Sequence, residues 1–221
     1  MFEHTQFSRD LKMQKLNYLQ GVNVDYQLLT QYIKELKQVD LLQYQTDEQK
    51  IAFWVNVYNG LTNYWIITLG LRKNMREAFR FFTKNKAIIG GYSFSLHLIE
   101  NGLLRGNRTH RMSFFRPFKP QDKRLSFSIQ KVDYRIHFAL NCGSASCPAI
   151  AYYSATKLNE QLSLAAESFC TQEFVVDTSK KKILCSRIFW LYRQDFDHIY
   201  INDPLYKDYC IRYTKYDHSI T

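Results

Sequence analysis

The sequence predicts one α+β domain, with helices in its N-terminal part and a small, mainly antiparallel sheet later in the chain. Apolar residues recur at helical spacing through the first third of the chain, whereas short β-type runs flank turn sequences further on. The 221 residues suffice for one hydrophobic core, and a hydrophobic fraction of 46% is that of a globular protein. We expect residues 1–45 to form a helical lead-in packed on a core of residues 46–221.

The N-terminal part is expected to be helical. Helices are predicted over residues 10–19, 25–36, 46–70 and 75–82. Thr46 and Gln49 form a capping box that begins the third helix. This helix is apolar around most of its circumference, so we expect it to lie buried at the centre of the domain and to pack on the sheet.

The remainder of the chain alternates short strands with helices. In order, we expect a hairpin over 88–94 around two glycines, a helix over 95–104, a strand over 136–140, a helix from Ser154 or Thr156 to about Cys170, a hairpin pairing 174–176 with 183–185, and a helix over 188–192.

The formal net charge of +10 favours an anionic partner. Residues 105–124, here called the basic loop, contain seven Arg and Lys residues, one Asp and three interleaved Phe residues. Pro117 and Pro120 predict a loop rather than a groove-reading helix, so a nucleic-acid surface is not favoured. The alternatives are a solvated loop and a lid over a small anionic or peptide-like substrate.

The cysteines and the apolar runs indicate a cytoplasmic protein. Five cysteines, an odd number, stand at spacings unlike those of secreted disulfide frameworks, so we expect reduced thiols. Residues 1–19 lack the apolar core of a signal peptide, and no apolar run is long enough to span a membrane. We expect no cofactor and no membrane partner, and the sequence does not indicate an oligomeric state.

The most informative segment, residues 135–148, reads RIHFALNCGSASCP. It carries His137 on a predicted strand and then two cysteines, Cys142 and Cys147, in a loop of small residues. Small residues let the backbone approach a ligand, and successive loop N–H groups bind anions. The segment therefore predicts the position of a site.

One interpretation is catalysis by a cysteine, which needs a base and an orienting group. His137 and Cys142 would point to opposite faces of a strand, so Cys147 is the better nucleophile if the loop folds back. Pro148 can begin a helical turn whose N-terminus lowers the pKa of the Cys147 thiol. Glu100 or Asn141 would orient the imidazole, which resembles the logic of papain-like peptidases and transglutaminases.

Polar residues near this segment are candidates for substrate binding. Asn56, Asn59 and Asn63 share one face of the long central helix, where unpaired amides are costly. They either line the site or tie down neighbouring loops. Arginines of the basic loop are suited to binding carboxylate or phosphate. The predicted substrate-binding residues are Asn56, Asn59, Arg105, Asn107 and Arg108.

Two further functions stay open. His137, Cys142 and Cys147 are spaced H-x4-C-x4-C, and with Cys185, Glu100 or His97 they would offer four ligands to zinc. This spacing differs from that of the usual zinc knuckle, so we predict no metal ligands. The other alternative is a non-catalytic module that binds a small anionic ligand or a protein partner.

Four ordered blocks resemble the signature of the family known as domain of unknown function 547. They read FWVNVYNGLTNYWI, IGGYSFSLHLIENGLLRGNR, RIHFALNCGSASCPAIAYY and SRIFWLYRQDF. The family's second block commonly reads Ile-Glu-His-Gly, whereas this chain has Asn101 in place of the histidine. The resemblance implies no defined activity, and any chemistry here must depend on Glu100, His137 and the cysteines.

Overall fold

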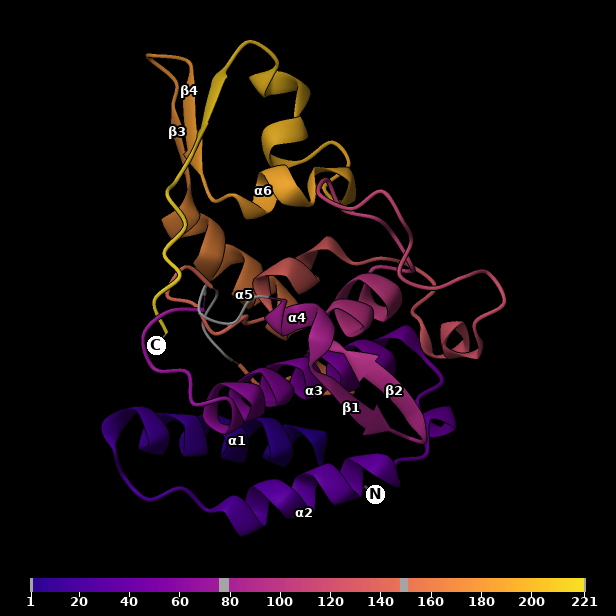
Figure 1. Cartoon of the computed structure of the whole chain (residues 1–221). Coiled ribbons are helices and arrows are strands. Elements are labelled where there is room, and N and C mark those ends of the chain that lie inside the picture. The colour runs from indigo at the N-terminus through magenta and orange to yellow at the C-terminus, as the bar shows by residue number, and fades with distance from the viewer. Residues whose placement is uncertain (1, 76–79, 148–150, 221) are drawn as a thin grey trace.

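The computed structural model describes residues 2–75, 80–147 and 151–220 and confirms the α+β class (Figure 1). The helices are α1 (His4–Gln20), α2 (Tyr26–Lys37), α3 (Asp47–Thr68), α4 (Phe81–Lys84), α5 (Leu158–Glu173) and α6 (Ile188–Leu191). The strands are β1 (Lys86–Ile89), β2 (Tyr92–Ser95), β3 (Phe174–Asp177), β4 (Lys182–Cys185) and β5 (Cys210–Tyr213).

Helix α3 is the buried centre of the N-terminal part, as expected. The capping box at its start is present: Thr46 Oγ1 accepts a hydrogen bond from the Gln49 N–H, and the Gln49 side chain accepts one from the Thr46 N–H. Helix α1 packs directly along α3, and Figure 1 shows α1 and α2 at the same end of the molecule. Gly60 permits this close approach, because a Cβ atom there would lie 2.2 Å from the Phe7 ring.

The strands form two small sheets rather than one. Strands β1 and β2 form the predicted antiparallel hairpin around the two glycines. The predicted hairpin of β3 and β4 is also present, and β5, which the sequence analysis missed, adds to β4 in parallel. Helix α3 packs mainly on α1 and on the segment 98–104 instead of lying on a single sheet.

Two predicted elements differ in the structure, and a third is described only in part. The strand expected over 136–140 is wrong: Tyr134–Phe138 is a 3₁₀-helix, which begins where the Asp133 carboxylate accepts a hydrogen bond from the Arg135 N–H. The helix expected over 95–104 is a π-helix at Leu98–Leu104. Residues 76–79, half of the helix expected over 75–82, lie outside the described residues, and α4 begins at Phe81.

Two hydrophobic cores meet at the 3₁₀-helix. Ile136 belongs to the larger core around α1, α2 and α3, whereas Phe138 belongs to the smaller core around α5, α6 and the β3–β5 sheet. His137, between them in sequence, is therefore held at the junction of the two cores. Across the described residues, no helix has the length and apolarity needed to cross a membrane.

The contact between α1 and α3 makes a prediction about stability. Gly60→Ala should lower the free energy of unfolding by about 1–3 kcal/mol, because the new methyl group clashes with Phe7. In a Phe7→Ala background the clash is gone, and the higher helix propensity of alanine should make the same substitution neutral or stabilising. Urea denaturation of the four proteins measures both effects. An equal cost in the two backgrounds would contradict this packing.

Candidate active site

A cavity of about 740 Å³ opens between the two cores. Its walls come from α3, the π-helix, the segment 137–147, α6 with the residues that follow it, and the C-terminal residues 216–218. The polar lining includes Tyr58, His97, Glu100, Asn101, His110, His137, Tyr192 and Tyr216; the sulfurs come from Cys142 and Cys147; the apolar wall includes Met75, Phe82, Met112, Leu140, Ile188, Trp190 and Leu191.

His137 is hydrogen-bonded to a carboxylate that the sequence analysis did not single out. Its Nε2 lies 2.9 Å from Oδ2 of Asp195, and both side chains are buried. The same carboxylate accepts hydrogen bonds from Arg105 Nε at 2.5 Å and from Arg108 at 3.1 Å. The His137 ring also stacks on Tyr192, with 4.1 Å between ring centroids. The imidazole is thereby fixed in position and orientation.

The protonation of this pair follows from its surroundings. Burial raises the pKa of Asp195, but its hydrogen bonds with His137 and Arg105 outweigh that effect and hold the pKa well below its usual range. Burial lowers the pKa of His137 more than the Asp195 carboxylate raises it. His137 is therefore neutral at pH 7. Because a carboxylate only accepts hydrogen bonds, the ring proton is on Nε2, and Nδ1 is the basic atom.

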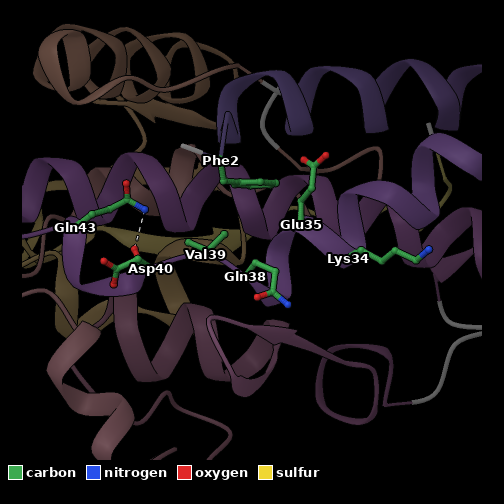
Figure 2. Close-up of a pocket in the computed structure, with 7 residues that line it drawn as sticks. All are labelled: Phe2, Lys34, Glu35, Gln38, Val39, Asp40 and Gln43. Atoms are coloured by element: carbon green, nitrogen blue, oxygen red, sulfur yellow. Dashed lines mark hydrogen bonds between the residues drawn. The ribbon is translucent and has the colours of Figure 1, made fainter.

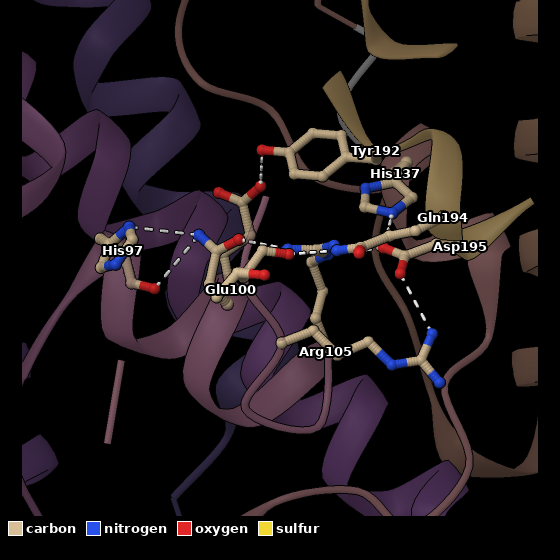
Figure 3. A network of polar contacts seen from close by, with 10 residues as sticks. His97, Glu100, Arg105, His137, Tyr192, Gln194 and Asp195 are labelled. Atoms are coloured by element: carbon tan, nitrogen blue, oxygen red, sulfur yellow. Dashed lines mark hydrogen bonds and ion pairs between the residues drawn. The ribbon is translucent and has the colours of Figure 1, made fainter. Parts of the chain in front are cut away.

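A row of polar side chains runs from the π-helix to this pair (Figure 3). His97, Asn101 and Arg105 are four residues apart; Asn101 Nδ2 lies 3.2 Å from His97 Nδ1, and Asn101 Oδ1 accepts a hydrogen bond from Arg105 at 2.7 Å. Asn101 thus lies between His97 and Arg105 in this row. Here it positions the arginine that holds Asp195, and π-helical turns of this kind often occur at functional sites.

Glu100 lines the same cavity from the π-helix. Its carboxylate accepts hydrogen bonds from the hydroxyl groups of Tyr192 and Tyr58, the latter at 3.3 Å. Burial and the nearby Glu100 charge raise the pKa of both tyrosines, so both hydroxyls stay protonated and donate. One interpretation of the sequence assigned the orienting role to Glu100. In the structure, Asp195 orients His137, and Glu100 is hydrogen-bonded to the two tyrosines instead.

The two cysteines of the small-residue loop are joined in a disulfide, so the expectation of reduced thiols at Cys142 and Cys147 is wrong. The Tyr216 hydroxyl lies 2.9 Å from Cys142 Sγ and 3.3 Å from Cys147 Sγ. The expected helical turn at Pro148 lies outside the described residues. Cysteines 170, 185 and 210 are free.

The C-terminal segment holds this loop in place. Ala145 N–H donates to the Ser219 carbonyl at 2.8 Å, and Asp217 N–H donates to Ser146 Oγ at 2.7 Å. Sequence reasoning missed this contact because the tail carries no motif. The segment brings Tyr216 to the disulfide and completes one wall of the cavity.

Two of the three α3 asparagines, Asn56 and Asn59, bind backbone rather than line the cavity, whereas the buried Asn63 amide has no hydrogen-bond partner among the described residues. Asn59 donates to the Ala139 carbonyl and accepts from the Asn141 N–H, and Asn56 makes the same pair of bonds to Tyr153. These contacts match the interpretation that the amides tie down loops. Asn141 Oδ1 accepts from the Gly143 N–H, which shapes the turn before the disulfide loop.

The remaining predicted binding residues are engaged elsewhere. Asn107 forms two hydrogen bonds to the backbone of Phe118, and Arg105 is fully buried against Asp195. Arg108 also contacts Asp195, so the expected arginine clamp for an anion is committed to an internal carboxylate.

A second hollow, of about 560 Å³, lies beside α2 and is lined by Phe2, Lys34, Glu35, Gln38, Val39, Asp40 and Gln43 (Figure 2). These side chains offer mixed charges and no cysteine or histidine.

The structure gives the zinc alternative no support. Asp195 occupies Nε2 of His137, and the two cysteine sulfurs are bonded to each other. Among the residues that the structure describes, no group of three or more His, Cys, Asp or Glu side chains is arranged to hold a metal ion.

A family comparison agrees with the sequence blocks. The family model described as "Protein of unknown function, DUF547" matches residues 42–170, which is more than half of the chain. The chain belongs to the DUF547 family. Neither the curated proteins nor the solved structures yielded a match, so the papain- or transglutaminase-like arrangement has no support from a solved structure.

The sequence analysis missed two residues of the candidate site in this DUF547 protein. Asp195 and Tyr192 lie in the aromatic block SRIFWLYRQDF, to which the sequence analysis gave no role in the site. The available signal was an acidic residue within an apolar segment, since a buried carboxylate requires a partner.

Histidine burial predicts how stability depends on pH. The native pKa of His137 lies below its ordinary value of 6.5, so below that pH the unfolded chain binds a proton that the native state does not. The free energy of unfolding should therefore fall from about pH 7.5 to about pH 5.5, by at most about 1.4 kcal/mol per pH unit from this group. His137→Gln should make the decline shallower in urea titrations. An unchanged slope would refute the assignment of a buried neutral imidazole.

The buried ion pair predicts a strong coupling. Arg105→Met or Asp195→Asn should each lower the free energy of unfolding by about 3–5 kcal/mol, because each leaves a buried group without its partner. The double variant should lose clearly less free energy of unfolding than the two single variants lose together. Chemical denaturation of the four proteins gives the coupling energy, and additive costs would be the contrary result.

Proposed function

We propose that this protein is a thiol-dependent acyl-transfer enzyme, a hydrolase or transferase, that acts after its Cys142–Cys147 disulfide has been reduced. The observation that carries the proposal is that one cavity is lined by both sulfurs and by a histidine held by a buried aspartate. Nucleophile, base and orienting acid are the three parts that such chemistry needs.

Cys147 is the proposed nucleophile. Its sulfur accepts a hydrogen bond from the Cys142 N–H at 3.1 Å and contacts the Tyr216 hydroxyl. Donors of this kind favour a thiolate over a thiol. Burial raises the pKa of Tyr216, so its hydroxyl stays a donor. Cys142 would then be the resolving cysteine that re-forms the disulfide.

The proposed reaction has two stages, reduction of the disulfide and then acyl transfer. A dithiol gives two electrons and two protons to the disulfide, which yields two cysteine thiols and one oxidised reductant. His137 takes the proton of Cys147 at Nδ1, and the thiolate attacks the acyl carbon. A C–S bond forms, the bond to the leaving group breaks, and the imidazolium returns the proton to that group. Water or another acceptor then releases the acyl group.

The lining favours a substrate with a substantial apolar part. Met75, Phe82, Met112, Trp190 and Leu191 form much of the wall. The basic-loop arginines that we expected to clamp an anion are paired with Asp195. Glu100 and its two tyrosines would accept hydrogen bonds from the polar part of the substrate.

The test compares reduced and oxidised protein on a panel of activated esters, thioesters and peptide amides. We expect turnover only after treatment with a phosphine or dithiol. Cys147→Ala and His137→Ala should lower kcat/KM by about 100-fold or more, whereas Cys210→Ala, which removes an exposed free thiol, should have no effect. Activity of the reduced enzyme should decline on acidification, as His137 becomes protonated.

Two results would contradict the proposal. One is turnover that Cys147→Ala leaves unchanged. The other is calorimetric binding of acyl compounds without product formation in the reduced protein, which would indicate the alternative of a non-catalytic binding module.

A further inference from the structure

Among the residues that the structure describes, the two most exposed large apolar side chains belong to the basic loop, and a third exposed one lies beside them. Phe114 is 94% exposed, Phe115 83% and Met112 71%. We call these three residues the aromatic tip. A single exposed apolar side chain is common, but three large ones on one turn mark an interaction surface.

The base of the loop is rigid although its tip projects. Asn107 forms two hydrogen bonds to the backbone of Phe118, at 2.9 and 3.0 Å, which closes the loop between them. Phe118 is buried against Gly102, where a Cβ atom would lie 2.2 Å from its ring. Near the tip, Arg111 N–H donates to the Leu191 carbonyl. The exposure of the tip is therefore held by the fold, so docking would require little reordering.

In the sequence, cations flank the tip on both sides and no acid lies among them. Residues 108–121 contain Arg108, Arg111, Arg116 and Lys119 and neither Asp nor Glu. Arg108 is paired with Asp195, but the salt bridges of the described residues include none of the other three cations. A target for this surface needs an apolar layer for the tip and anions around it.

We propose that the aromatic tip and its flanking cations dock the protein on an anionic lipid bilayer. Phe114 and Phe115 would enter the boundary between headgroups and acyl chains, and Arg116 and Lys119 would contact the anionic headgroups. A bilayer fits better than a protein groove, because the two rings project almost without neighbours and no concave partner shape is needed. This inference is independent of the proposed chemistry.

Docking would also set the position of the cavity. Met112 belongs to the tip and also lines the cavity, and His110, two residues before it, lines the cavity as well. The apolar cavity would therefore open close to the lipid surface.

Vesicle co-sedimentation tests the proposal with the full chain. The probes are vesicles of phosphatidylcholine alone and of equal parts phosphatidylserine and phosphatidylcholine. We expect binding to the mixed vesicles and much less to phosphatidylcholine alone. Phe114→Ser with Phe115→Ser should lower the partition coefficient at least about tenfold, because two rings lose their apolar environment. Leu42→Ser with Leu205→Ser, which removes two comparably exposed apolar side chains elsewhere, should leave it unchanged.

Charge variants separate the electrostatic contribution. Arg116→Gln with Lys119→Gln should weaken binding to the mixed vesicles by about fivefold per cation, and high salt should remove the difference. Lys37→Gln with Lys207→Gln is the control of equal charge and should leave binding near that of the parent protein.

Three outcomes would overturn the proposal. The first is vesicle binding that the Phe114/Phe115 variant leaves unchanged. The second is self-association that this variant abolishes in a protein that does not bind vesicles, since the tip would then be an interface between copies. The third is tip-dependent binding of a single-stranded oligonucleotide in the absence of vesicle binding.

Discussion

The carboxylate of Asp195 connects the parts of this protein that are far apart in sequence. It accepts from Arg105 at the end of the π-helix, from Arg108 in the basic loop and from His137 at the junction of the two cores. A buried charge is tolerated only when its partners are correctly placed. The position of the residues after α6 is therefore tied to the position of the π-helix, and the cavity between them has a defined width.

The second constraint is the polar face of α3. A helix so fully buried would ordinarily be apolar throughout, yet Asn56 and Asn59 pair with the backbone of two segments that have little regular structure of their own. A side-chain amide that both donates to and accepts from the backbone of one segment fixes the position of that segment along α3, as a neighbouring strand would in a sheet. These bonds replace a sheet behind the disulfide loop, which explains how a loop can be precisely held without one.

Local signals in the sequence predicted much of the N-terminal fold. The Thr46 capping box, the helical spacing before it and the Gly90–Gly91 turn each depend on neighbours within a few residues, and all three are present. The prediction of a strand at 136–140 was wrong because alternating apolar residues are also found in a helical turn that lies between two cores. Alternation alone does not distinguish the two cases. The cavity contains the segment around His137, where the sequence predicts a site, but Asp195 and Tyr216 reach this segment only through contacts across long sequence separations. No local pattern reports such contacts.

The boundary of the family match divides the cavity. Residues 42–170 contain Tyr58, Glu100, His137 and both bonded cysteines, whereas Asp195 and the wall formed by 187–192 and 216–218 lie beyond the match. A protein built from the matched segment alone would present the sulfurs and the imidazole in an open trough, without the carboxylate that orients the ring. The part that carries the sulfurs and the imidazole therefore depends on residues 187–218 for the closed wall of the cavity and for the carboxylate that orients the ring.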